Sequence, residues 1–207
     1  LNEAAKLNDA PSSDDMDAVP LCIPLGTSLS TEYLSAMNVA GEYAYAGREW
    51  VVNRVLQILG TSALQHVHNH HNFAWWETHL GMSVLVTRKG ATPARPGQMG
   101  FVGASMSEDA VIIRGVDTTA SQAGLYSAMH GAGRVMGRRE AKGVWKKGVC
   151  KREGKIDWVT ERDRVRALGI ELRGAGADEA SPCYKRLPDV IAAHGGTIEV
   201  VHTLRPI

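Results

Sequence analysis

Apolar residues recur at three- and four-residue steps across residues 31–59, the longest periodic stretch of the chain. This spacing places the apolar side chains along one face of an α-helix. Ser30 or Thr31 is a suitable N-terminal cap, and Gly60 is suited to ending the helix in the left-handed conformation. The pattern therefore predicts a helix about 40 Å long, at 1.5 Å per residue.

Beyond residue 60 the periodic stretches are shorter. Alternating apolar runs, which predict half-buried strands, occur at residues 83–87, 110–114 and 198–204. Helical spacing returns at residues 125–142, 160–168 and 188–194. Thr160 is expected to cap the second of these helices, and Gly169 is expected to end it. The mixture indicates an α+β fold with mixed β-sheets and flanking helices.

The N-terminal residues 1–17 show no such periodicity. They carry one lysine against five acidic residues, and Pro11 precedes two serines. This composition predicts a linker or loop.

Composition excludes several classes of protein. Apolar residues make up 44% of the 207 residues and charged residues 22%, which is ordinary for a globular chain and excludes global disorder. The net charge of +1 provides no overall field for attracting nucleic acid, so such a partner must be recognised by local patches. No apolar run is long enough to span a membrane, and we expect no membrane partner. The three cysteines lie far apart, which is typical of a reducing cytoplasm.

Four histidines lie within six residues, at His66, His68, His70 and His71. Neutral imidazole is a common ligand of manganese, zinc, iron and copper. This density favours a metal site. The alternative is a polar loop, or histidines hydrogen-bonded beneath Trp75 and Trp76, and the residues alone leave both open.

Three short segments have the residue types of a nucleotide site. In residues 130–134, His-Gly-Ala-Gly-Arg, a histidine stands next to backbone donors and an arginine that suit a phosphate. In residues 88–92, two cations precede a glycine at a strand end, which suits a phosphate or a carboxylate. The small residues of 103–107 permit close approach of a flat ligand. Taken singly, each segment is also explained by tight packing, a solvated strand end or an ordinary turn.

A basic stretch follows the histidine. Residues 134–155 contain nine lysines and arginines against two glutamates, a local charge of 9 − 2 = +7, with Trp145 and Trp158 nearby. Such a stretch suits the backbone of RNA or DNA, with aromatic rings for stacking. A solvated surface is the alternative.

In their order along the chain, these segments resemble the C-terminal half of the RtcB family of RNA-splicing ligases. The resemblance runs from about residue 18 to residue 207. It rests on seven strings: NHHNFAWWE (69–77), RKGATPARPGQ (88–98), GASM (103–106), VIIRG (111–115), HGAGRVMGRREA (130–141), DEASPCYKRLPDV (178–190) and TLRPI (203–207).

The resemblance implies a function. The family uses GTP and Mn²⁺ to join an RNA 3′-phosphate or 2′,3′-cyclic phosphate to a 5′-hydroxyl through a guanylylated histidine. It implies RNA ends as partners, from tRNA halves in splicing or from broken RNA in repair, together with GTP and an archease-like activator. Residues 18–207 would then be the C-terminal part of an RtcB-like catalytic domain.

The resemblance also implies site residues. His130 corresponds to the nucleophile that carries GMP, and His71 corresponds to a manganese ligand. The residues that match nucleotide-contacting positions are Asn72, Gly103, Ala104, Ser105, Met106, Ala110, His130, Gly131, Ala132, Gly133 and Tyr184.

The sequence departs from the family pattern in two respects. The family loop Pro-Gly-Ser-Met-Gly reads Gly-Ala-Ser-Met-Ser here, and Ala110 replaces a serine that contacts guanine in many members. The motifs that supply the other metal ligands, Asp-x-x-Cys, Gly-Asn-His and His-x-Gly-Ser-Arg-Gly, are absent from these residues. An alternative hypothesis is therefore a truncated, non-ligating remnant that binds a guanine nucleotide or RNA. The upstream reading frame would distinguish the two.

Overall fold

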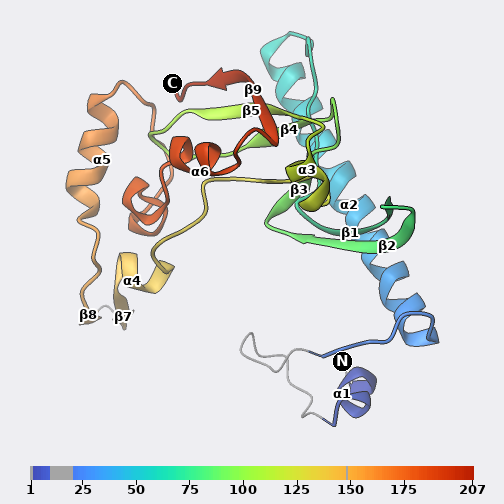
Figure 1. Cartoon of the computed structure of the whole chain (residues 1–207). Coiled ribbons are helices and arrows are strands. Elements are labelled where there is room, and N and C mark those ends of the chain that lie inside the picture. Colours follow the sequence, from blue (N-terminus) through green and yellow to red (C-terminus); the bar gives the residue numbers. More distant parts are fainter. Residues whose placement is uncertain (1, 10–20, 148) are drawn as a thin grey trace. The chain divides into compact units, whose positions relative to one another are not determined.

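The structure is a computed structural model that describes residues 2–9, 21–147 and 149–207, without the side chain of Trp145. The chain divides into two compact units, residues 1–64 and residues 65–207 (Figure 1). In the first unit, helix α1 (Asn2–Leu7) occupies part of the segment for which we expected a linker or loop. Residues 10–17 of that segment lie outside the described residues.

The predicted long helix is confirmed as α2 (Ser28–Leu59). Its N-cap is Thr27, not Ser30 or Thr31: the Thr27 hydroxyl accepts a hydrogen bond from the Ser30 amide at 3.2 Å. Gly60 ends the helix as expected, with a φ of 63° and its N–H directed to Gln57 and Leu56.

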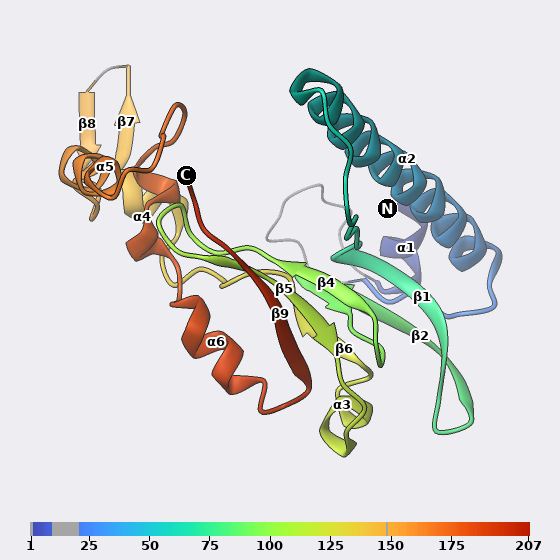
Figure 2. The same cartoon turned by 90° about the horizontal axis from the view of Figure 1, so that it is seen from above.

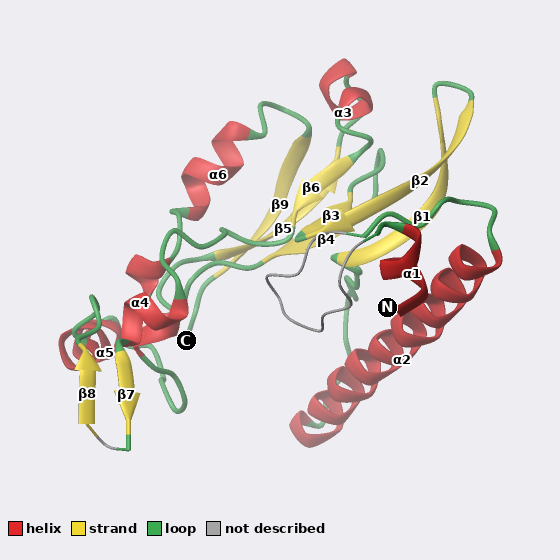
Figure 3. Cartoon of the chain, turned by 90° about the horizontal axis from the view of Figure 1, so that it is seen from below, coloured by secondary structure: helices red, strands yellow, loops and turns green. Residues whose placement is uncertain are grey.

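The second unit is built on small antiparallel sheets (Figures 2 and 3). Strands β1 (Asn72–His79) and β2 (Met82–Lys89) form a hairpin, and β3 (Ala91–Pro93) pairs with β6 (Ser127–Met129). A three-stranded sheet has the order β4 (Met99–Val102), β5 (Ala110–Gly115) and β9 (Ile198–Leu204). Strands β7 (Val144–Lys146) and β8 (Val149–Arg152) form a second hairpin.

The main core lies around the three-stranded sheet. Its buried residues are Ala94, Val102, Val111, Ile113, Ala128, Ala132 and Leu187. Helix α6 (Leu187–Ala193) contributes Leu187 to this core and packs Val190 and Ile191 against it. The helices α3 (Thr119–Ala123), α4 (Arg138–Lys142) and α5 (Trp158–Ala167) and the single 3₁₀ turns η1 (Ala177–Glu179) and η2 (Ser181–Cys183) complete the unit.

The α+β class and all three predicted strands are confirmed. The strand pairs that the structure describes are antiparallel, and parallel pairing is limited to isolated bridges such as Gly103 with Gly131. The helices predicted at 160–168 and 188–194 correspond to α5 and α6. Asp157, rather than Thr160, caps α5, because its carboxylate accepts from the amides of Val159 and Thr160.

The helix predicted at 125–142 is wrong. This segment forms strand β6, an irregular stretch and the short helix α4. Leu125 and Tyr126 have φ values of 52° and 47°, and Gly133 has a φ of 77°, all incompatible with a right-handed helix. The backbone donors that a helix would satisfy internally instead pair with other segments, as Ala132 does with Gly103.

Candidate nucleotide site

His130 directly follows strand β6 and has an exposed side chain. The β3–β6 register places Ala91 opposite Met129, so the glycine before β3 lies beside His130. Gly90 has a φ of +71°, and a Cβ built there would lie 3.5 Å from His130 Cδ2. The positive φ favours glycine at this position, and the imidazole lies in van der Waals range of the backbone between β2 and β3.

The imidazole rings of His71 and His130 stack, with their centroids 4.6 Å apart and an interplanar angle of 24°. Gly90 also holds the chain before β1, because its N–H donates to the His71 carbonyl at 2.7 Å and to Asn72 Oδ1 at 2.9 Å. His66 and His68 stack on each other instead, and His70 stacks on Phe73. Of the four clustered histidines, His71 is thus the one that stacks on His130, and it is also the one that the resemblance matches to a metal ligand.

The loop at 103–106 joins the same site through its backbone. The Gly103 N–H donates to the His130 carbonyl at 3.1 Å, and the Ala132 N–H donates to the Gly103 carbonyl at 3.0 Å. A Cβ on Gly131 would lie 3.1 Å from the Gly103 oxygen, so the two segments meet at glycines. Ala104 and Met106 are half-buried. Ser105 is buried, and its hydroxyl finds no hydrogen-bond partner within the described residues.

Tyr184 is held next to the glycine-rich segment from the other side. The Lys185 N–H donates to the Gly133 carbonyl at 2.9 Å, and Arg134 forms an isolated antiparallel bridge with Tyr184. The Arg134 guanidinium lies 4.8 Å from the Tyr184 ring centroid and donates to its hydroxyl at 2.8 Å. Burial, and then the hydrogen bond to Glu179, raise the pKa of Tyr184 above its usual value.

Arg134 was expected to meet an external phosphate, but the fold uses most of its donors. It also donates to the carbonyls of Met136 and Asp178, at 3.1 and 2.6 Å. Arg134 is therefore a tether between the glycine-rich segment and the turns before Tyr184.

A cleft of about 430 Å³ opens beside Tyr184. It is lined by Ser107, Glu108, Arg164, Ser181, Pro182, Tyr184 and Arg186. Ser107 directly follows the 103–106 loop, so the cleft adjoins two of the segments matched to nucleotide contacts. Ala110 begins β5, whose next residue pairs with the residue before Gly103. The residues predicted from five separate segments are therefore brought together, although their roles stay predictions.

The described residues do not complete a manganese site. They contain no group of three or more histidine, cysteine, aspartate or glutamate side chains arranged to hold a metal ion. His71 is a chemically suitable ligand, but a single imidazole does not form a divalent-metal site.

Glu77 is a site-supporting residue that the sequence reasoning missed. Its side chain is 2% exposed, as is that of Arg88, and the two form a bidentate pair at 2.7 and 3.0 Å. Arg95 and His79 also contact this carboxylate, at 2.8 and 2.7 Å. Burial alone would raise the pKa of Glu77, but the hydrogen bonds from Arg88 and His79 and the charges of Arg88 and Arg95 hold it below its usual value.

The Glu77–Arg88 pair reaches the strand that carries His130. Arg88 donates to Ser127 Oγ at 2.9 Å and to the Leu125 carbonyl at 2.7 Å. Leu125 and Tyr126 have unfavourable positive φ values just before β6. The hydrogen bond from Arg88 to the Leu125 carbonyl stabilises this turn. Of the two cations at 88–92, Arg88 thus pairs with a carboxylate of the protein itself, and Lys89 is exposed. In the sequence, this ion pair was indicated by Glu77 in one strand and by Arg88 and Lys89 at the end of the next strand.

Known proteins of similar sequence point to one family. Residues 4–207 match the family model described as tRNA-splicing ligase RtcB. The chain is 32% identical over 196 residues to the RNA-splicing ligase RtcB of Escherichia coli K12. The aligned region covers 88% of this chain and 44% of that protein. It is 28% identical to the tRNA-splicing ligase RtcB of Archaeoglobus fulgidus, covering 90% of this chain and 43% of that one.

The chain thus spans less than half the length of these relatives. None of the helices that the structure describes is long and apolar enough to cross a membrane. The family match covers nearly the whole chain, and the chain belongs to the RtcB family.

Proposed function

We propose that this chain provides the nucleotide-carrying part of an RNA ligase that joins 3′-phosphate or 2′,3′-cyclic phosphate ends to 5′-hydroxyl ends. The observation that carries the proposal is the exposed His130 ring, stacked on His71 and flanked by the backbone of Gly103 and Gly131. A neutral imidazole in such a setting is a competent nucleophile toward phosphorus.

The proposed reaction has three transfers. A ring nitrogen of His130 attacks the α-phosphorus of GTP, and the bond to pyrophosphate breaks. The RNA 3′-phosphate then displaces the histidine, which leaves GMP on the RNA end through a new phosphoanhydride. Attack by the 5′-hydroxyl forms the phosphodiester and releases GMP. A 2′,3′-cyclic phosphate must first be hydrolysed to the 3′-phosphate.

The chain's own residues hold the nucleotide in this proposal. Residues 130–133 line the GMP phosphate and ribose, Asn72 contacts the nucleotide, and the 103–106 loop with Ala110 and Tyr184 surrounds the base. Mn²⁺, with His71 as one ligand, would supply positive charge beside the phosphates. The buried Ser105 hydroxyl, which has no described partner, supports a polar ligand atom near this loop.

A second candidate is a non-ligating module that binds a guanine nucleotide or RNA. The absence of a three-ligand group among the described residues favours it, as do the changed residues around the base. This candidate predicts nucleotide binding without RNA joining.

RNA joining by the purified chain tests the proposal. The chain would be incubated with GTP, Mn²⁺ and an RNA that has 3′-phosphate and 5′-hydroxyl ends, and the products resolved on a gel. We expect joined RNA from the wild type and from the control His202→Ala, whose exposed histidine lies on β9, and none from His130→Ala. Joining by His130→Ala would refute the proposal. Nucleotide binding without joining by the wild type would select the second candidate.

A further inference from the structure

The structure separates the basic stretch into two groups of cations. The first group is neutralised by neighbouring acids. Arg134 and Arg138 pair with Glu179, Lys142 pairs with Asp178, and Lys155 pairs with Glu140. The positive charges of these four residues are thus largely neutralised within the folded chain.

The second group forms no ion pair among the described residues, and of its members Arg152 acts through its charge on Glu140, which itself pairs with Lys155. It comprises Arg139, Lys146, Lys147, Lys151 and Arg152, all exposed, and we call it the hairpin surface. Its positions lie on α4 and on the β7–β8 hairpin, with Glu153 as the nearest acidic residue in the sequence. The hairpin surface therefore keeps a net charge of about 5 − 1 = +4 within a chain whose total is +1.

The hairpin is fixed to α4 by its backbone. Lys155 and Ile156 donate their N–H groups to the carbonyls of Glu140 and Ala141, at 2.9 and 3.1 Å. A Cβ on Gly143 would lie 2.4 Å from the Arg152 carbonyl oxygen, and a Cβ on Gly154 would lie 2.2 Å from the Ala141 oxygen. Only a glycine, which has no Cβ, allows two backbone segments to approach so closely. The backbone of the hairpin therefore has a defined position relative to α4.

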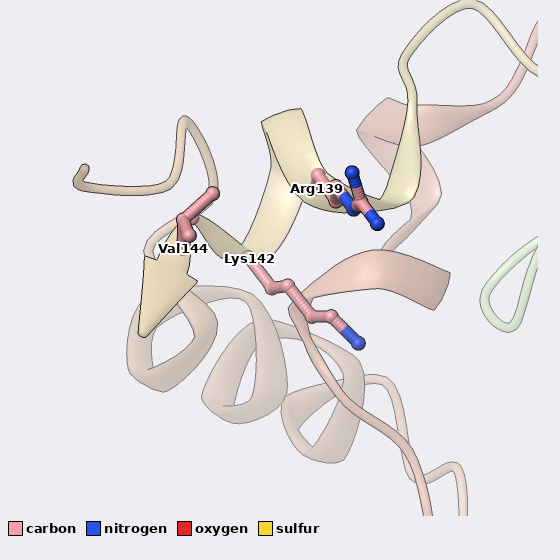
Figure 4. A pocket seen from close by; sticks show the side chains of 4 residues that line it. Arg139, Lys142 and Val144 are labelled. Atoms are coloured by element: carbon pink, nitrogen blue, oxygen red, sulfur yellow. The ribbon is translucent and has the colours of Figure 1, made fainter. Parts of the chain in front are cut away.

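A hollow of about 450 Å³ lies against α4. It is lined by Arg139, Lys142, Gly143 and Val144. Figure 4 shows that the charged ends of Arg139 and Lys142 extend on the same side of the helix, away from Val144. Lys142 is paired with Asp178, so Arg139 is the cation of this lining that forms no ion pair among the described residues, and its guanidinium suits a phosphate oxygen.

The hairpin surface lies within reach of a polymer held at His130. Eight residues separate His130 from Arg138, the first residue of α4, so at most about 28 Å lies between their backbones. At about 3.4 Å per nucleotide along one strand of a duplex, this corresponds to roughly eight nucleotides. An RNA of this length with its end at His130 therefore reaches the start of α4, to whose backbone the chain after the hairpin is hydrogen-bonded.

We propose that the hairpin surface binds the phosphate backbone of RNA, several nucleotides away from the end that reacts at His130. The proposal rests on the proposed function for its substrate. Exposed lysines act as point charges toward phosphates and read no base edges, so the contact is independent of RNA sequence and sensitive to salt. It holds the body of the RNA and takes no part in forming the GMP adduct.

Salt-dependent RNA binding tests this assignment. The affinity of the chain for a 20-nucleotide single-stranded RNA would be measured by fluorescence anisotropy between 50 and 200 mM KCl. The test variant replaces Lys146, Lys147 and Lys151 with glutamine. The matched control replaces three exposed arginines with glutamine. They are Arg114, Arg173 and Arg205, which pair with Glu199, Glu171 and Asp109. Both variants lose three positive charges.

We expect the test variant to bind about 100-fold more weakly at 0.1 M salt, with the slope of log K against log salt reduced by about 2. The control should keep the wild-type slope within about 0.5. Replacement of the same three lysines with arginine should retain wild-type affinity, which distinguishes lost charge from lost folding. Equal slopes for test and control variants would overturn the proposal, as would binding of acidic phospholipid vesicles through these lysines without binding of RNA.

GMP labelling of the same variants separates this proposal from the proposed function. Labelling of His130 should be unchanged in the lysine variant. If the wild type is never labelled but RNA binding still depends on the three lysines, the ligase proposal fails and the hairpin surface stands. If labelling occurs and the lysines have no effect on RNA binding, the hairpin surface fails alone.

Discussion

Glu77→Gln tests how strongly the buried ion pair supports the site. The substitution keeps the shape of the side chain but removes the charge that neutralises Arg88, which is 2% exposed. Removal of one partner from a buried pair typically costs about 3–5 kcal/mol, because the remaining charge stays desolvated. Against a usual total stability of about 5–15 kcal/mol, such a loss is easily measured.

Urea unfolding followed by circular dichroism measures the difference. The matched control is Glu199→Gln, whose partner Arg114 lies at 3.5 Å with the two side chains 59% and 44% exposed. That exposed pair should contribute less than about 1 kcal/mol. In the double variant Glu77→Leu with Arg88→Met, two apolar side chains should recover part of the stability lost by Glu77→Gln, because no buried charge remains unpaired.

The pH dependence gives an independent check. Because the pKa of Glu77 is lowered in the folded chain, the ionised carboxylate stabilises the fold above the unfolded-state pKa of about 4.3. This contribution is lost as the pH falls through the folded-state pKa. The stability difference between wild type and Glu77→Gln should therefore be full at pH 7 and shrink below about pH 4.3. A difference of less than 1 kcal/mol at pH 7 would refute the reasoning.

Two further substitutions test the backbone around His130. Gly131→Ala should reduce GMP labelling of His130 and destabilise the fold by about 1–3 kcal/mol, because its Cβ would lie 3.1 Å from the Gly103 oxygen; unchanged labelling and melting temperature would contradict the close contact. Leu125→Gly should raise stability by a few tenths of a kcal/mol or leave it unchanged in urea unfolding, because the residue has a φ of 52°. A loss above about 1 kcal/mol would show that the leucine side chain outweighs the backbone strain.

The sequence predicted the elements whose signals are local. Periodic apolar spacing located α2, and Gly60 ended it as expected. Period-two alternation located β5, whose Val111 and Ile113 are buried in the core, and β9, whose Ile198 packs against that core. The grouping of His71 with His130 followed from the resemblance, because the order of motifs implies a shared site that no local pattern defines.

The remaining features depend on contacts between distant segments. The 125–142 stretch has helical spacing, yet Gly131 forms a bridge with Gly103, and Arg88 donates a hydrogen bond to the Leu125 carbonyl in its first turn. Strand β1 was missed because its aromatic-rich sequence does not alternate cleanly, with Ala74 and Glu77 both buried. The pairing of three of the nine cations of the basic stretch with Asp178 and Glu179 appears only when the chain is folded.

The most direct test of the central claim is the intact mass of the purified chain after incubation with GTP and Mn²⁺. We predict a gain of one GMP that is lost on brief acid treatment, maps to the peptide containing His130, and is absent from His130→Ala. No gain in mass while GTP is bound, or an adduct that persists in His130→Ala, would contradict the assignment of His130 as the residue that carries the nucleotide.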